Sequence, residues 1–165
     1  MPLLRQREVV ADTWVTVDAA ADAPVPADDV AVIVPFAKFR ESPDTWRNRK
    51  GALGIRLSPA DKIEDLAPEL PRLSLVAIEF TGPGEGRGYS QAKLLRARYK
   101  FAGEVRAVGY VKQDLVYLMA RVGIDTFDLS PDQKPEEALA TLDRFKIAYT
   151  PGSPLPGLRR ERFHA

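Results

Sequence analysis

Apolar residues along the chain fall into short runs, separated by segments that are rich in glycine, proline and charge. The runs are dominated by β-branched and other aliphatic side chains, which is typical of buried strands. They predict five strands, at 30–36, 53–57, 75–80, 105–111 and 125–129. A partly alternating segment at 9–17 predicts one further strand near the N-terminus.

Between these strands, apolar side chains recur every three or four residues, which predicts helices. Ser–Pro pairs at Ser42 and Ser58 indicate two helix starts, and Ser90 is a suitable N-cap for a third helix. Two later helices are predicted, over 115–122 and 135–145.

The predicted strands begin 20 to 30 residues apart, which is the spacing of repeated βα units. We therefore expect an α/β fold with a mostly parallel sheet and an antiparallel edge strand at the N-terminus. The spacing leaves two architectures open, an open layer and a partial barrel. Residues 1–150 are expected to form one domain in which 18–29 is a mobile loop, followed by an irregular basic tail at 151–165.

The amino-acid composition excludes several classes of metal site and catalytic site. The 165 residues include no cysteine and one histidine, so thiolate zinc sites, protein-ligated iron–sulfur clusters and Ser-His-Asp triads lack the residues they need. No metal site is expected. The 24 Lys and Arg nearly balance the 23 Asp and Glu, which argues against a nucleic-acid or membrane partner. Neither an export signal nor a membrane span is visible, so we expect a cytoplasmic protein.

The segment TGPGEGRGYSQAK at 81–93 is the most informative part of the chain for function. It joins the strongest predicted strand to a helix whose free amide groups would point back at the loop. A guanidinium in this loop can hold a phosphate, sulfate or carboxylate with two parallel hydrogen bonds. We predict an anion site formed by Gly86, Arg87, Gly88, Tyr89 and Ser90. The alternative is a flexible loop in which Ser90 is an ordinary N-cap.

Most of the predicted strands also contain one charged residue, namely Arg56, Glu79, Arg106 and Asp128. Their alternating signs fit a structural ladder of ion pairs, or a ligand crevice at the carboxyl edge of the sheet. If the protein is an enzyme, Glu79 is the candidate acid/base and Tyr110 a candidate proton donor. Arg106 would then help Arg87 to hold an anionic substrate.

Three longer stretches resemble a bacterial family of unknown function over about residues 30–129. Its genes commonly lie beside those for sulfite or nitrite reductase and phosphoadenylyl-sulfate reductase, and some members carry an oxidoreductase label. The resemblance rests on a GRGYS…LLR…RAVG pattern that comprises Gly86, Arg87, Gly88, Tyr89, Ser90, Leu95, Arg96, Arg106, Ala107, Val108, Gly109 and Asp114.

The chain departs from this family pattern at three positions. Glu85 stands where the family usually has aspartate, Tyr110 where it favours aspartate, and Val122 where cysteine is common. The last two departures argue against a mechanism that needs an aspartate at the position of Tyr110 or a cysteine at the position of Val122.

What the resemblance implies is an accessory role in assimilatory sulfite or sulfate reduction, through an anionic metabolite or a partner such as sulfite reductase. A reductase activity would need a bound nicotinamide or flavin, for which the sequence contains no motif, so the cofactor stays unknown. Two alternatives stay open, a small enzyme acting on a phosphorylated or sulfonated substrate and a structural subunit without a ligand. A homo-oligomer is compatible with each of these.

Overall fold

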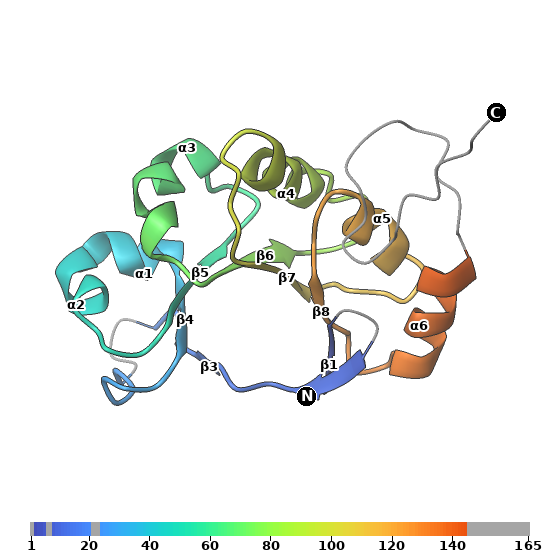
Figure 1. Ribbon diagram of the computed structural model, residues 1–165, viewed down its shortest axis with the longest axis horizontal. Coiled ribbons are helices and arrows are strands. Elements are labelled where there is room, and N and C mark those ends of the chain that lie inside the picture. The colour runs from blue at the N-terminus through green and yellow to red at the C-terminus, as the bar shows by residue number, and fades with distance from the viewer. Residues whose placement is uncertain (1, 6–7, 21–23, 145–165) are drawn as a thin grey trace, which may run out of the picture.

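The protein folds into one curled sheet of eight strands with helices on its outer face (Figure 1). The computed structural model describes residues 2–5, 8–20 and 24–144. Six parallel strands follow one another across the sheet in chain order: β3 (Val15–Thr16), β4 (Val32–Pro35), β5 (Leu53–Leu57), β6 (Leu75–Phe80), β7 (Glu104–Gly109) and β8 (Thr126–Asp128). The prediction of a mostly parallel α/β fold is confirmed.

Helical segments follow each parallel strand from β4 to β8 and cover one face of the sheet. They are α1 (Phe36–Glu41), α2 (Pro43–Arg47), α3 (Ile63–Leu66), η1 (Ala67–Arg72), α4 (Arg87–Ala97), α5 (Val116–Arg121) and α6 (Pro135–Arg144). When parallel strands are adjacent in chain order, right-handed crossovers place every helix on the same side. The sheet is therefore a half-barrel, which decides between the two architectures that the sequence left open.

The N-terminal strands close much of the open side of this half-barrel. β1 (Pro2–Arg5) pairs antiparallel with both β8 and β2 (Glu8–Ala11), so β2 and β3 are the two edges of the sheet. Seven strand spacings would separate these edges by about 34 Å in a flat sheet. However, only residues 12–14 join them, which limits the distance between Ala11 and Val15 to about 14 Å. The sheet must therefore curl, and this short segment crosses its concave inner face.

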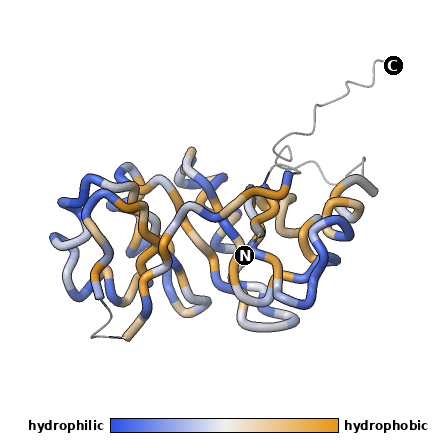
Figure 2. Tube along the Cα trace, turned by 90° about the horizontal axis from the view of Figure 1, so that it is seen from below, coloured by the Kyte–Doolittle hydropathy of each residue, from blue (hydrophilic) through white to orange (hydrophobic). Residues whose placement is uncertain are grey.

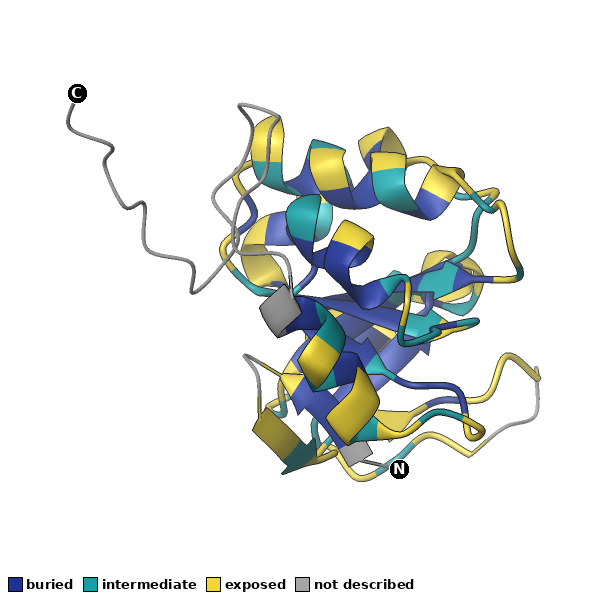
Figure 3. Cartoon of the chain, turned by 90° about the vertical axis from the view of Figure 1, so that its right-hand side faces the viewer, coloured by how far each residue is buried: buried dark blue, intermediate teal, exposed yellow. Residues whose placement is uncertain are grey.

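Apolar residues fill both faces of the central strands. On the outer face, Val76, Ile78 and Phe80 of β6 belong to the same core as Ala92 and Leu95 of α4. On the inner face, Trp14 packs with Ile33, Leu75 and Ala77. Figure 2 shows hydrophobic stretches alternating with hydrophilic ones along the chain, and Figure 3 shows buried residues in the sheet and on the sheet-facing sides of the helices. Side-chain alternation along each strand decides which residues face the helices and which face inward.

Three details differ from the sequence-based expectations. The N-terminal segment 9–17 is divided between β2 and β3, and β1 was not predicted at all. Asp61 accepts hydrogen bonds from the amide and hydroxyl of Ser58, which forms a turn there, and α3 begins only at Ile63.

The predicted loop 18–29 contains no helix or strand among its described residues, and the predicted tail at 151–165 lies outside the described residues.

Candidate functional site

Three loops meet at the carboxyl edge of the parallel strands, where ligands bind in sheets of this kind. They follow β5, β6 and β7, and each leads to a helix on the outer face. The middle one is the glycine-rich loop at 81–86. It lies between two hollows, one on the side of the β5–α3 loop and one on the side of the β7–α5 loop.

The glycine-rich loop turns sharply and then starts α4. Gly84 has a φ of +87°, which favours glycine, and the amide of Glu85 donates to the carbonyl of Gly82 at 3.3 Å. The carboxylate of Glu85 accepts from the amide of Arg87 at 3.0 Å, so α4 begins at Arg87 rather than at Ser90. No described residue accepts a hydrogen bond from the next two amides, those of Gly88 and Tyr89.

The first hollow has a volume of about 720 Å³ and lies between residues 59–64 and the loop and first turns of α4. Gln91 lines it and is almost fully buried. Its amide nitrogen donates to the carbonyls of Ser58 and Asp61, both at 2.9 Å, which fixes the orientation of the amide group. Its Oε1 is buried and accepts no hydrogen bond from the described part of the chain. An acceptor of this kind is costly unless a donor reaches it.

Three carboxylates and two cations line the first hollow, and each carboxylate already has a partner within the protein. Asp61 accepts from Ser58, Glu64 pairs with Arg98 at 3.6 Å, and Glu85 caps α4. The side chains of Lys62 and Arg87 line the same hollow and form no ion pair within the described ranges. Asp61 and Glu85 bond only to neutral groups and keep their negative charge, so the hollow offers an anion two cations without a protein partner rather than an overall positive charge.

The second hollow has a volume of about 330 Å³ and shares Gly84, Glu85 and Gly86 with the first. Tyr89 and Tyr110 line it, and the ring of Tyr89 packs edge-on against Phe80 with ring centroids 5.3 Å apart. Burial, and then the charge of Asp114, raise the pKa of the Tyr89 hydroxyl, so this hydroxyl stays protonated at neutral pH.

The structure brings together part of the predicted site and separates the rest. Arg87 and Ser90 line the first hollow, Tyr89 and Tyr110 line the second, and Gly86 lines both. Gly88 lies behind them, where a Cβ would come within 2.6 Å of the Phe80 ring. Its role is therefore close packing of α4 on β6.

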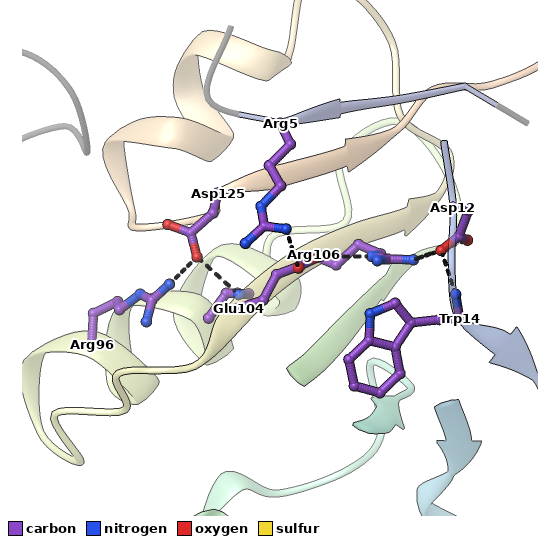
Figure 4. Close-up of polar contacts among 8 residues, drawn as sticks. Arg5, Asp12, Trp14, Arg96, Glu104, Arg106 and Asp125 are labelled. Carbon is purple, nitrogen blue, oxygen red and sulfur yellow. Dashed lines mark hydrogen bonds and ion pairs between the residues drawn. The ribbon is translucent and has the colours of Figure 1, made fainter. Parts of the chain in front are cut away.

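Glu79 and Arg106 lie on the inner face of the sheet, away from both hollows. Glu79 is 3.9 Å from Arg56, and neither residue lines a hollow. Arg106 is buried and bonds to Glu104 and to Asp12, at 3.0 Å in each case (Figure 4). Three of the four strand charges, Arg56, Glu79 and Arg106, thus form ion pairs with protein partners.

Sequence reasoning did not single out Asp12, Gln91, Lys62 or Glu104 for these roles. Asp12 is 94 residues away from Arg106 along the chain, and only the curl of the sheet brings them together. Gln91 carries no charge and sits in an ordinary helical pattern. The one available signal was the rule that a buried charge needs a partner. This rule predicts partners for Arg106 but does not identify them.

The inner face also contains a carboxyl group whose ionisation opposes folding. Burial raises the pKa of Asp128 above its ordinary value, and the nearby Arg106 only partly offsets this. One of its oxygens is buried without a donor among the described residues. A raised pKa in the folded state means that the stability present at low pH is lost as the pH rises through this pKa.

Replacing Asp128 by asparagine should therefore stabilise the protein at pH 7 and have little effect near pH 3.5. The amide keeps the shape of the side chain and cannot ionise. Urea unfolding of the wild-type protein and the D128N variant at both pH values measures this difference. A variant that is less stable than the wild-type protein at pH 7 would contradict the assignment.

The described residues lack both a metal-binding cluster and a membrane-spanning helix. Within them, no group of three or more His, Asp and Glu side chains is placed to hold a metal ion. No helix in this part of the chain is long and apolar enough to cross a membrane.

Comparison with protein families identifies the family of this chain. The family described as "Bacterial protein of unknown function (DUF934)" matches residues 54–155. None of the curated proteins that were compared matches the chain. The matched range contains both hollows and Arg106, and it confirms the resemblance to a bacterial family of unknown function.

Proposed function

The chain belongs to this family of bacterial proteins of unknown function, and we propose that it binds a small anionic metabolite in the first hollow. We propose further that it does so as an accessory protein of sulfite or sulfate reduction, the role that the family resemblance implies. Sulfite and sulfate are therefore the first ligands to test, together with phosphate. Binding of a reductase partner stays a prediction of the same resemblance.

The observation that carries this proposal is the imbalance of engaged and free groups around the first hollow. Its three carboxylates already have partners, whereas Lys62 and Arg87 have none among the described residues. Arg87 and Ser90 place the start of α4 beside this hollow, which adds the positive end of a helix dipole. Buried Gln91 supplies an acceptor for a ligand that also carries a donor, such as a hydroxyl group.

Gly86 gives independent support, because nothing within the protein requires glycine there. Its φ is −81°, which any residue adopts, and a Cβ would meet no atom within 4 Å. A side chain at this position would instead project beside both hollows. A glycine that neither backbone strain nor packing requires is expected where a ligand approaches the backbone closely.

Thermal unfolding in the presence of sulfate, sulfite or phosphate tests this proposal, with chloride at equal ionic strength as the reference. A ligand at 100 times its dissociation constant adds about 2.7 kcal/mol, or about 5–10 °C in Tm for a chain of this size. We expect R87Q to remove most of this shift. The matched control is R72Q, because Arg72 is exposed and lies outside both hollows.

Two results would overturn the proposal. One is a shift no larger than that in chloride for all three anions. The other is an equal shift in the wild-type, R87Q and R72Q proteins, which would show a general effect of salt. We assign no catalytic step to Glu79, because it is engaged with Arg56 on the inner face.

A further inference from the structure

We propose that the two hollows are halves of one site for a nucleotide, with the anionic group in the first hollow and the purine ring in the second. This inference rests on the proposed function and adds the class of ligand. The argument has three steps: the shared wall, the chemistry of the second hollow and the direction of the charge.

The two hollows are joined by a thin wall of backbone. Gly84, Glu85 and Gly86 line both of them, and a Cβ at Gly84 or Gly86 would meet nothing within 4 Å. The wall therefore presents little side-chain bulk at two of its three residues. A ligand lying across the loop would contact its backbone from both sides.

The second hollow combines apolar walls with a few free polar groups, which is the usual make-up of a site for an organic ligand. Its walls include Leu115 and Leu118, and Leu118 is 47% exposed, so its side chain is accessible to a ligand. Two tyrosine rings, Tyr89 and Tyr110, supply flat surfaces for stacking.

The free polar groups of the second hollow select for N–H donors on a ring. Within the described residues, no hydrogen bond or ion pair engages the carboxylate of Asp114 or the hydroxyls of Tyr89 and Tyr110. A carboxylate accepts hydrogen bonds from the amino and imino groups of a purine, and the hydroxyls can donate to its ring nitrogens. An aliphatic ligand would form none of these hydrogen bonds.

The charged residues of the two hollows give the ligand one direction. The lining of the second hollow includes two carboxylates, Glu85 and Asp114, and no cation, whereas the first also offers the cations Lys62 and Arg87. The phosphate therefore belongs beside the start of α4, and the ring belongs between Tyr110 and Leu118. Arg87 and Asp114 accordingly act on different parts of the same ligand.

Isothermal titration calorimetry with AMP, GMP, adenosine and inorganic phosphate tests the inference on the full chain. We expect at least one of the two nucleotides to bind ten or more times tighter than phosphate and adenosine. L118N should weaken nucleotide binding at least tenfold and leave phosphate binding unchanged. R87Q should weaken both nucleotide and phosphate binding. The control for L118N is V25N, since Val25 is also exposed but lies away from the hollows.

The outcomes separate this inference from the proposed function. If phosphate binds and neither nucleotide binds tighter, the second hollow is not a ring site, and anion binding in the first hollow stands. If a nucleotide binds tighter but L118N and V25N are equally harmless, the ring lies elsewhere and the inference is wrong. G86A gives a further check, because we expect it to keep the wild-type Tm and lose nucleotide affinity. Unchanged affinity in G86A would contradict a ligand that crosses the loop.

Discussion

Replacing Arg106 by methionine should lower the free energy of unfolding by about 3–5 kcal/mol. The guanidinium bonds to Glu104 and Asp12, and the Arg106 and Glu104 side chains are 4% and 9% exposed (Figure 4). Methionine fills a similar volume but leaves Asp12 without its cation and Glu104 with only the exposed Arg5. It also removes the positive charge that offsets the burial of Asp128. Urea unfolding at pH 7 measures the loss.

The matched control is R5M. Arg5 also pairs with Glu104, at 3.7 Å, but its side chain is 51% exposed, so its loss should cost about 1 kcal/mol or less. A cost below about 1 kcal/mol for R106M would show that the inner-face ion pairs add little to stability. We also expect R106M, measured below its Tm, to keep the wild-type affinity for anions, because Arg106 lines neither hollow.

Replacing Arg96 by methionine should lower the free energy of unfolding by about 3 kcal/mol. Arg96 leaves α4 and donates to three backbone carbonyls, those of Phe101, Gly103 and Gly123. It also pairs with Asp125, whose carboxylate accepts from the amide of Val105 as well. One side chain therefore ties α4 to the starts of β7 and β8. Its loss leaves several partly buried acceptors without a donor, and hydrogen bonds from charged groups are the stronger ones.

R98M on the same helix is the control for R96M. Arg98 is 63% exposed and pairs only loosely with Glu64 at 3.6 Å, so we expect a change within about 0.5 kcal/mol. R96K should recover only part of the stability, because an ammonium group lacks the planar fork of a guanidinium. Equal stability of R96K and the wild-type protein would mean that charge alone matters at this position.

Much of the fold could be predicted from the sequence because local patterns are strong in βα units. The apolar runs at 53–57 and 75–80 coincide with β5 and β6, and the predicted helix at 135–145 differs from α6 by one residue. β1 was missed because four residues carry too little pattern, and its partner β8 lies more than a hundred residues away. The division of 9–17 into two strands follows from the curl of the sheet, which no local pattern encodes.

The candidate site was predictable in place but not in detail. Glycines and a helix start pointed to the loop before Ser90, because those are local features. Which charges remain free depends on tertiary partners, and this separates Arg87 from Arg106. The residues that carry the family resemblance divide in the same way. Arg96 and Arg106 hold the fold together, whereas Gly86 and Arg87 line the hollows.

The most direct test of the central claim is an amide chemical-shift titration of the ¹⁵N-labelled protein with inorganic sulfate and phosphate. Anion binding at the first hollow predicts saturable shifts that are largest for Gly86, Arg87, Gly88, Tyr89 and Ser90. Those shifts should be greatly reduced in R87Q. Small, unsaturable shifts spread over the surface, or saturable shifts confined to another part of the molecule, would contradict the account.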